Sequence, residues 1–120
     1  MSNLENAQSL YSLMGEGKMM EAFEKFYAED CEIIEANGET RKGKDEQRAA
    51  LIDWETNMVK EMHGGGVGAI TADEKNNITM VESWVDITNP QGQRFKMEEV
   101  AVQKWQNGQI IQERFYYNMP

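Results

Sequence analysis

The sequence predicts an α+β domain in which helices come first and an antiparallel sheet follows. Up to residue 66 most apolar residues recur at helical spacing, and from residue 67 apolar and polar residues alternate. Asn107-Gly108, inside the alternating region, is a strong signal for a two-residue β-hairpin turn. Strands joined by successive hairpins form a meander, and helices that precede such a meander cover one of its faces.

Composition limits the classes of protein that this chain can represent. Its 120 residues carry a formal net charge of −9, and 40% of them are hydrophobic, which suits one domain over residues 1–120. An acidic chain without a basic block is a poor partner for nucleic acid, and no apolar run is long enough to span a membrane. One cysteine and one histidine cannot build a zinc site, so we expect neither a metal nor a cofactor. A lone cysteine and no secretory signal favour the cytoplasm.

Two short helices and a strand are expected before residue 36. Ser2 and Glu5 form a capping box that starts the first helix, and Gly15-Glu16-Gly17 ends it. A second helix carries three apolar residues on one face: Met20, Phe23 and Tyr27. A short strand over 31–35 and a turn over 36–39 follow.

A longer helix is predicted after Gly43, where Asp45 and Glu46 suit the positive end of the helix dipole. Its apolar stripe has spacings of three, four and four residues and consists of Leu51, Trp54, Met58 and Met62. Gly64-Gly65-Gly66 is expected to end this helix, and His63 is expected to cap it.

Four strands are then predicted, at about 67–72, 78–87, 94–105 and 109–117. Alternation puts two sets of side chains on common faces, one in each of the last two strands: Met97, Glu99, Ala101 and Gln103, and Glu113, Phe115 and Tyr117. If these faces are concave, Glu99 is a second acid of a pocket, whereas a register slip of one residue would leave it in solvent beside Glu98.

Three segments resemble a known family. Residues 26–38 have the form of an aromatic strand entry and a short strand that ends in an acid, residues 41–44 contain the glycine that opens a long helix, and residues 102–117 form a closing hairpin. In these segments the sequence is similar to the nuclear-transport-factor-2-like superfamily, in its SnoaL-like branch. The resemblance implies a cystatin-like cone: a curved antiparallel sheet wrapped around a long helix, with N-terminal helices and an internal pocket. It also implies a homodimer.

The ketosteroid isomerases of this superfamily imply two catalytic residues. Their base, the acid that ends the first strand, corresponds to Glu35, and their tyrosine donor corresponds to Tyr11. Their second, acidic donor corresponds to Ala101, so that group is absent at this position. Apolar walls around Glu35 would favour its protonated form and suit it to proton abstraction.

The pocket would be lined by residues of the long helix and the sheet. The expected substrate-binding residues are Trp54, Met58, Trp84, Met97, Glu99, Phe115 and Tyr117. The alternative for each apolar residue is ordinary core packing. Three functions remain open: an acid-base isomerase, cyclase or dehydratase acting on a small apolar, carbonyl-containing molecule; a non-catalytic module that binds such a molecule; and a dimeric assembly domain.

Overall fold

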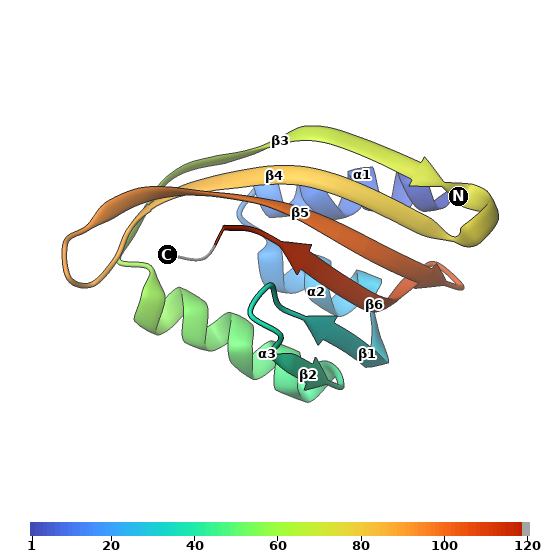
Figure 1. Cartoon of the computed structure of the whole chain (residues 1–120), viewed down its shortest axis with the longest axis horizontal. Coiled ribbons are helices and arrows are strands. Elements are labelled where there is room, and N and C mark those ends of the chain that lie inside the picture. Colours follow the sequence, from blue (N-terminus) through green and yellow to red (C-terminus); the bar gives the residue numbers. More distant parts are fainter. Residues whose placement is uncertain (119–120) are drawn as a thin grey trace.

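The computed structural model describes residues 1–118 and confirms the predicted α+β class, with the helices gathered on one side of a curved sheet (Figure 1). The helices are α1 (Asn3–Gly15), α2 (Met19–Phe26) and α3 (Lys44–Asp53), and α3 continues into a π-helical turn, η1 (Trp54–Met58). The strands are β1 (Tyr27–Ile34), β2 (Thr40–Lys42), β3 (Glu61–Asp73), β4 (Ile78–Thr88), β5 (Arg94–Gln106) and β6 (Gln109–Tyr116). A 3-10 turn, η2 (Glu74–Asn76), joins β3 to β4.

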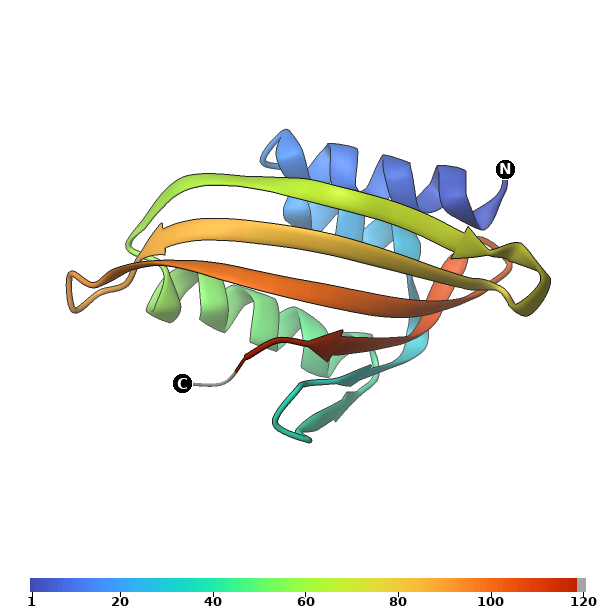
Figure 2. The same ribbon diagram turned by 45° about the horizontal axis from the view of Figure 1, so that its top comes forward.

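The six strands form one sheet in the order β2-β1-β6-β5-β4-β3. Neighbours are antiparallel except β1 and β6, which run parallel because the chain returns to β1 only after the whole meander. The long strands β3, β4 and β5 bend over the helices, and turning the molecule shows α1, α2 and α3 beneath the same concave face (Figure 2). None of the helices within residues 1–118 combines the length and the apolar character that a membrane crossing requires.

The first helix begins as its sequence predicts, and a residue distant in sequence, Glu74, provides a second cap. The Ser2 hydroxyl accepts the Glu5 amide at 3.1 Å, and the Glu5 carboxylate accepts the Ser2 amide at 3.0 Å. The carboxylate of Glu74 also accepts the amides of Asn3 and Leu4, at 3.0 and 2.9 Å. These amides have no partner within the helix, so Glu74 both satisfies them and stabilises the positive end of the helix dipole.

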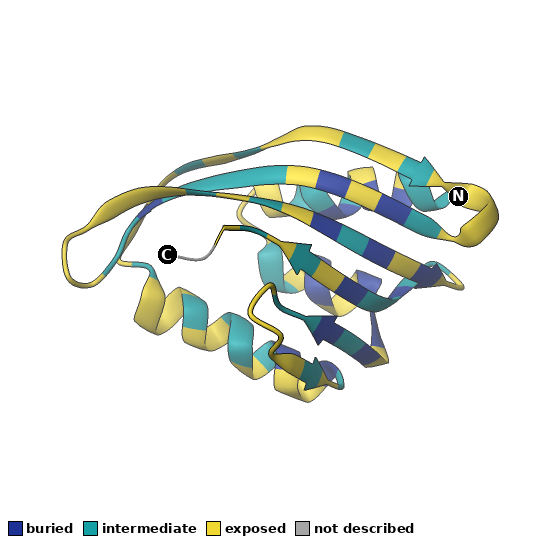
Figure 3. Cartoon of the chain, viewed as in Figure 1, coloured by how far each residue is buried: buried dark blue, intermediate teal, exposed yellow. Residues whose placement is uncertain are grey.

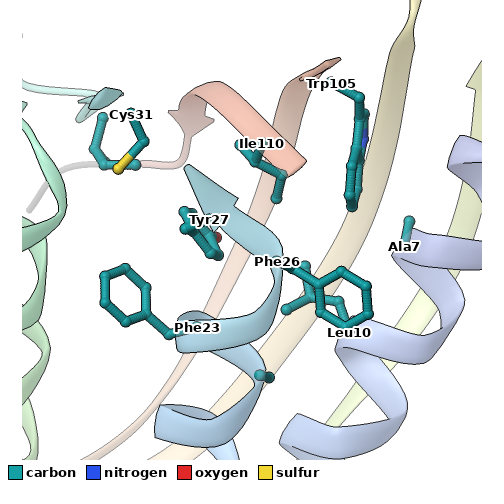
Figure 4. Close-up of a cluster of buried hydrophobic side chains, with 10 residues drawn as sticks. Ala7, Leu10, Phe23, Phe26, Tyr27, Cys31, Trp105 and Ile110 are labelled. Carbon is teal, nitrogen blue, oxygen red and sulfur yellow. The ribbon is translucent and has the colours of Figure 1, made fainter. Parts of the chain in front are cut away.

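The core lies where α1 and α2 meet the inner face of the sheet, and along the strands buried residues alternate with more exposed ones (Figure 3). Phe26 packs edge-to-face on Trp105 with ring centroids 6.2 Å apart, and Phe23 lies 5.0 Å from Tyr27. Figure 4 shows Phe26 beside Leu10 and below Trp105, with Phe23 and Tyr27 nearer to Cys31, all in one buried cluster. This core occupies only one end of the layer between helices and sheet, the end at which α1 begins.

The prediction for the third helix was wrong at its end. The helix stops at Met58, and the triglycine run lies inside β3, with Gly65 opposite Val85. Met62 and His63 are therefore strand residues, and His63 caps no helix; its Nε2 lies 2.6 Å from the Thr88 hydroxyl. Glycine is a common helix terminator, but tertiary contacts can also require it in a strand.

The reason for glycine here is the indole of Trp84, which lies across Gly64 and Gly66. A Cβ at Gly66 would be 2.9 Å from Trp84 Nε1, closer than packing allows, and one at Gly64 would be 3.6 Å from the ring. Residues 84 and 66 face each other in the ladder, on the side opposite the buried residues Val81 and Ile87. The Trp84 side chain therefore lies on the outer face of the sheet, with Lys96 Nζ 4.8 Å from the ring centroid.

Other helix and strand boundaries also differ from the predicted ones. The predicted strand over 31–35 spans Tyr27–Ile34, so Tyr27 opens β1 instead of lying on the face of α2, and the short strand β2 was not predicted. The Asn107-Gly108 turn is confirmed, with φ of 53° and 76° at its two residues.

Replacing Glu74 by Ala should destabilise the fold by about 1 kcal/mol, because two amides at the start of α1 lose their acceptor. Urea unfolding followed by circular dichroism measures this loss. Lys75→Ala, one residue further on, is the matched control and should leave the midpoint unchanged. Equal midpoints for the two variants would contradict the long-range cap.

Candidate functional site

An open cleft of about 1760 Å³ lies between the helices and the concave face of the sheet, next to the core. Its apolar lining comes from α2, α3, η1, β5 and β6: Phe23, Leu51, Trp54, Met58, Met97 and Phe115. Apolar side chains at the rim stay exposed, including Met58 at 53% and Met62 at 49%. A concave apolar surface with flexible methionines at its edge is typical of a binding site for a small molecule.

Glu35 lies in the wall of this cleft and is held by two side chains. Arg41 Nη2 donates to Glu35 Oε2 at 2.8 Å, and the Tyr117 hydroxyl donates to Oε1 at 3.3 Å. Arg41 Nε in turn donates to Gln47 Oε1 at 2.6 Å, which fixes the guanidinium. With 21% of its side chain exposed, Glu35 is half-buried and charge-paired. The apolar surroundings expected for this carboxyl are thus replaced by an ion pair with Arg41 and a hydrogen bond from Tyr117.

A second carboxyl, that of Glu99, lines the same cleft from β5 in a different environment. Strand alternation turns it to the concave face with Met97 and Ala101, as predicted, while Glu98 points outward. Burial, followed by the nearby charges of Glu113 and Glu35, raises the pKa of Glu99 to about 7. Glu99 therefore holds its proton up to about neutral pH, whereas Glu35 forms an ion pair with Arg41.

A third carboxyl, Glu113 of β6, is buried completely at the inner end of the cleft. The Tyr27 hydroxyl donates to Oε1 at 2.5 Å, and Gln103 Nε2 donates to Oε2 at 2.7 Å. Burial raises the pKa of Glu113, and these two hydrogen bonds oppose that shift without cancelling it. Both oxygens are thus satisfied by neutral donors, and Glu113 joins β1, β5 and β6 in the interior.

Tyr11, on α1, reaches the cleft beside this buried acid. Its hydroxyl oxygen accepts a hydrogen bond from Gln103 Nε2 at 3.2 Å. Burial, and then the charges of Glu113 and Glu99, raise the pKa of Tyr11, so the phenol keeps its proton. The charge of Glu99 contributes to the raised pKa of Tyr11, the charge of Glu35 contributes to the raised pKa of Glu99, and all three residues line the cleft.

The structure brings together most of the residues singled out in the sequence. Those that line the cleft are Tyr11, Glu35, Trp54, Met58, Met97, Glu99, Phe115 and Tyr117. Trp84 does not join them through its side chain, which lies on the outer face, although the strand that carries it borders the cleft.

Two contributors to the site were missed. Arg41 could have been found, because the turn over 36–39 predicts a hairpin that puts Arg41 opposite Ile33 and close to the end of β1. Strand alternation puts Glu113 on the face of Phe115 and Tyr117, but Glu113-Arg114 also has the pattern of an exposed pair, so Glu113 was not counted among the site residues. Within residues 1–118 no group of three or more histidine, cysteine or acidic side chains is arranged to hold a metal ion.

Several solved structures have this architecture. A candidate SnoaL-like polyketide cyclase of Mesorhizobium loti is 30% identical, with a TM-score of 0.86, and the match covers 98% of this chain and 100% of that one. A candidate isomerase of Bacillus subtilis is 16% identical over 98% and 90%, with a TM-score of 0.81. A protein of Catenulispora acidiphila with a ketosteroid isomerase-like fold, in complex with trimethylamine, is 14% identical over 82% and 74%, with a TM-score of 0.70.

Sequence comparison agrees with the fold. No curated protein matches the sequence. The family model of the SnoaL-like domain matches residues 1–117, so the match spans all of the secondary structure described above. The chain belongs to the SnoaL-like domain family.

Proposed function

We propose that this protein is an acid-base enzyme acting on a small apolar molecule that carries a carbonyl group. Glu35 is the base, and Tyr11 and protonated Glu99 are hydrogen-bond donors to the carbonyl oxygen. The apolar body of the substrate packs on Trp54, Met97 and the other apolar side chains that line the cleft.

One observation carries this proposal: two carboxyl groups of the same cleft have opposite environments. Arg41 forms an ion pair with Glu35 at 2.8 Å, while burial and neighbouring acids raise the pKa of Glu99 to about 7. Pairs of titratable groups separated in this way are typical of sites that transfer protons, because one group accepts a proton while the other donates a hydrogen bond.

The proposed step moves one proton. Glu35 takes a proton from the carbon next to the carbonyl, and the electron pair of the C–H bond moves onto the carbonyl oxygen to form an enolate. Tyr11 and Glu99 stabilise the negative oxygen. Where the substrate carries a carbon–carbon double bond conjugated with the enolate, Glu35 then returns the proton to the far carbon of that double bond, and the double bond shifts by one position. This sequence isomerises the substrate. An enolate that instead attacks a second carbonyl would close a ring.

Deuterium uptake next to a carbonyl tests the first half of this step without knowledge of the natural substrate. In D₂O the protein should accelerate exchange at the carbon beside the carbonyl of α-tetralone, followed by proton NMR. Glu35→Gln should slow the exchange at least about a hundredfold, because general base catalysis contributes that much.

Glu98→Gln is the control for this experiment, because Glu98 points to the opposite face of the sheet from Glu99. It should leave the rate unchanged. Binding of bicyclic ketones without any exchange would favour the second candidate function, a non-catalytic binding module built on the same open apolar cleft.

The protonation of Glu99 predicts a pH dependence of stability. Above pH 4.5 the unfolded chain releases this proton while the folded protein keeps it up to about pH 7, so the stability that Glu99 contributes falls as pH rises through this window. Glu99→Gln stays neutral. Its unfolding free energy relative to the wild type should therefore increase between about pH 5 and about pH 8. Urea titrations at both values measure this increase, and a constant difference would show that Glu99 has an ordinary pKa.

We also propose that two copies associate through the outer face of the sheet. This face exposes Met80, Val100 and Tyr116, the last at 52%, and Val100 and Tyr116 face each other across β5 and β6. Adjacent exposed apolar side chains on a sheet surface are typical of an interface. Such an arrangement leaves the cleft, on the other face, open to substrate.

The substitution Tyr116→Glu should convert a dimer into a monomer, because it places a charge in the middle of the apolar contact. Native mass spectrometry at micromolar concentration measures the masses. Met58→Glu, which changes an equally exposed apolar side chain at the cleft, is the control and should remain dimeric. A wild-type protein that is only monomeric under these conditions would exclude the association.

A further inference from the structure

A chain of hydrogen bonds runs from the hydrophobic core to the cleft. Trp105 Nε1 donates to the Thr79 hydroxyl at 2.7 Å, and that hydroxyl donates to Gln103 Oε1 at 2.7 Å. Gln103 Nε2 then donates to the Tyr11 hydroxyl oxygen at 3.2 Å. Trp105, Thr79 and Gln103 are all buried, and Tyr11 lines the cleft.

The direction of this chain is set at its first member. An indole N–H can only donate, so the oxygen of Thr79 accepts from it. Within residues 1–118 the hydroxyl hydrogen of Thr79 has one acceptor, Gln103 Oε1, so the hydroxyl donates to the acceptor end of the Gln103 amide. The amide is thereby oriented with its nitrogen toward Tyr11 and Glu113. Its two hydrogens match its two neighbours, Glu113 Oε2 and the Tyr11 oxygen.

The other neighbours of Gln103 do not impose this direction. A phenol can donate or accept, and Glu113, whose pKa is raised by burial, can do the same when it carries its proton. Either orientation of the amide would therefore satisfy Tyr11 and Glu113. Reversed, the amide would present its oxygen to Tyr11, and the phenol would donate its hydrogen inward. Of these groups, only the indole of Trp105 must act as a donor.

We propose that Trp105, Thr79 and Gln103 are positioning residues that make Tyr11 a hydrogen-bond donor into the cleft. Because Gln103 occupies the Tyr11 oxygen as a donor, the phenolic hydrogen stays available, and no group within residues 1–118 accepts it. The proposal deepens the proposed function, on which it rests, since the acceptor of this hydrogen is the carbonyl oxygen of the bound molecule.

The orientation of the Gln103 amide is measurable in the wild-type protein without a ligand. In ¹⁵N-labelled protein its side-chain NH₂ hydrogens should exchange slowly and show nuclear Overhauser effects to the Tyr11 ring. Effects to the Thr79 methyl group in place of the Tyr11 ring would mean that the amide is reversed, and this result would overturn the proposal.

The consequence for binding is tested with two ligands that differ only in a carbonyl group, α-tetralone and tetralin. The ratio of their dissociation constants isolates the hydrogen bond to the carbonyl. Wild type should prefer the ketone, and Tyr11→Phe should reduce the preference about threefold to tenfold, the range for one net hydrogen bond. Thr79→Val and Trp105→Phe should reduce the preference in the same direction while tetralin affinity stays constant.

Thr79→Ser keeps the hydroxyl and is the matched control, so it should retain the wild-type ratio. A purely structural effect of Thr79→Val would weaken both ligands equally, and an unchanged ratio in this variant would overturn the relay. A wild-type protein that binds both ligands equally would instead refute the carbonyl recognition of the proposed function, and the NMR result alone would then decide the direction of the chain.

Discussion

The buried carboxyl of Glu113 is the interaction on which the interior depends. No basic side chain within residues 1–118 forms an ion pair with it, so it is tolerated in the core because Tyr27 and Gln103 satisfy both of its oxygens. Through these two residues and Tyr11, the acid links α1, β1, β5 and β6 at the point where the apolar core ends and the cleft begins. A network in which every member is satisfied is rigid, and this rigidity gives the cleft a defined polar end.

The chemistry of the cleft depends on the different surroundings of two of its acids, Glu35 and Glu99. Glu35 emerges at the end of β1, where the β1–β2 hairpin supplies Arg41. Glu99 forms no ion pair within residues 1–118 and is partly buried near other acids, so its proton is retained to about neutral pH. The same type of side chain therefore has two environments within one cleft, because one is next to a guanidinium and the other is buried near carboxylates.

The two faces of the sheet have separate tasks. The concave face carries the core at one end and the cleft at the other, since α1 and α2 fill only part of the space beneath the long strands. On the outer face Trp84 lies flat against glycines of β3, which keeps this part of the sheet smooth next to exposed apolar residues. Judged from the local sequence alone, these glycines would mark the end of a helix. They lie in a strand instead, because the Trp84 indole occupies the space where their side chains would be.

Local pattern alone determined the α+β class, the capping box at Ser2, the Asn107-Gly108 turn and the common face of Glu99 and Ala101, because each depends on neighbours within a few residues in the chain. Long-range packing decided the rest. The place of Gly64 and Gly66 in a strand depends on an indole from β4, the partner of Glu35 on a hairpin, and the buried position of Glu113 on donors from β1 and β5. A side chain's charge state and the direction of its hydrogen bonds depend on which groups surround it in space, and sequence spacing does not specify those groups.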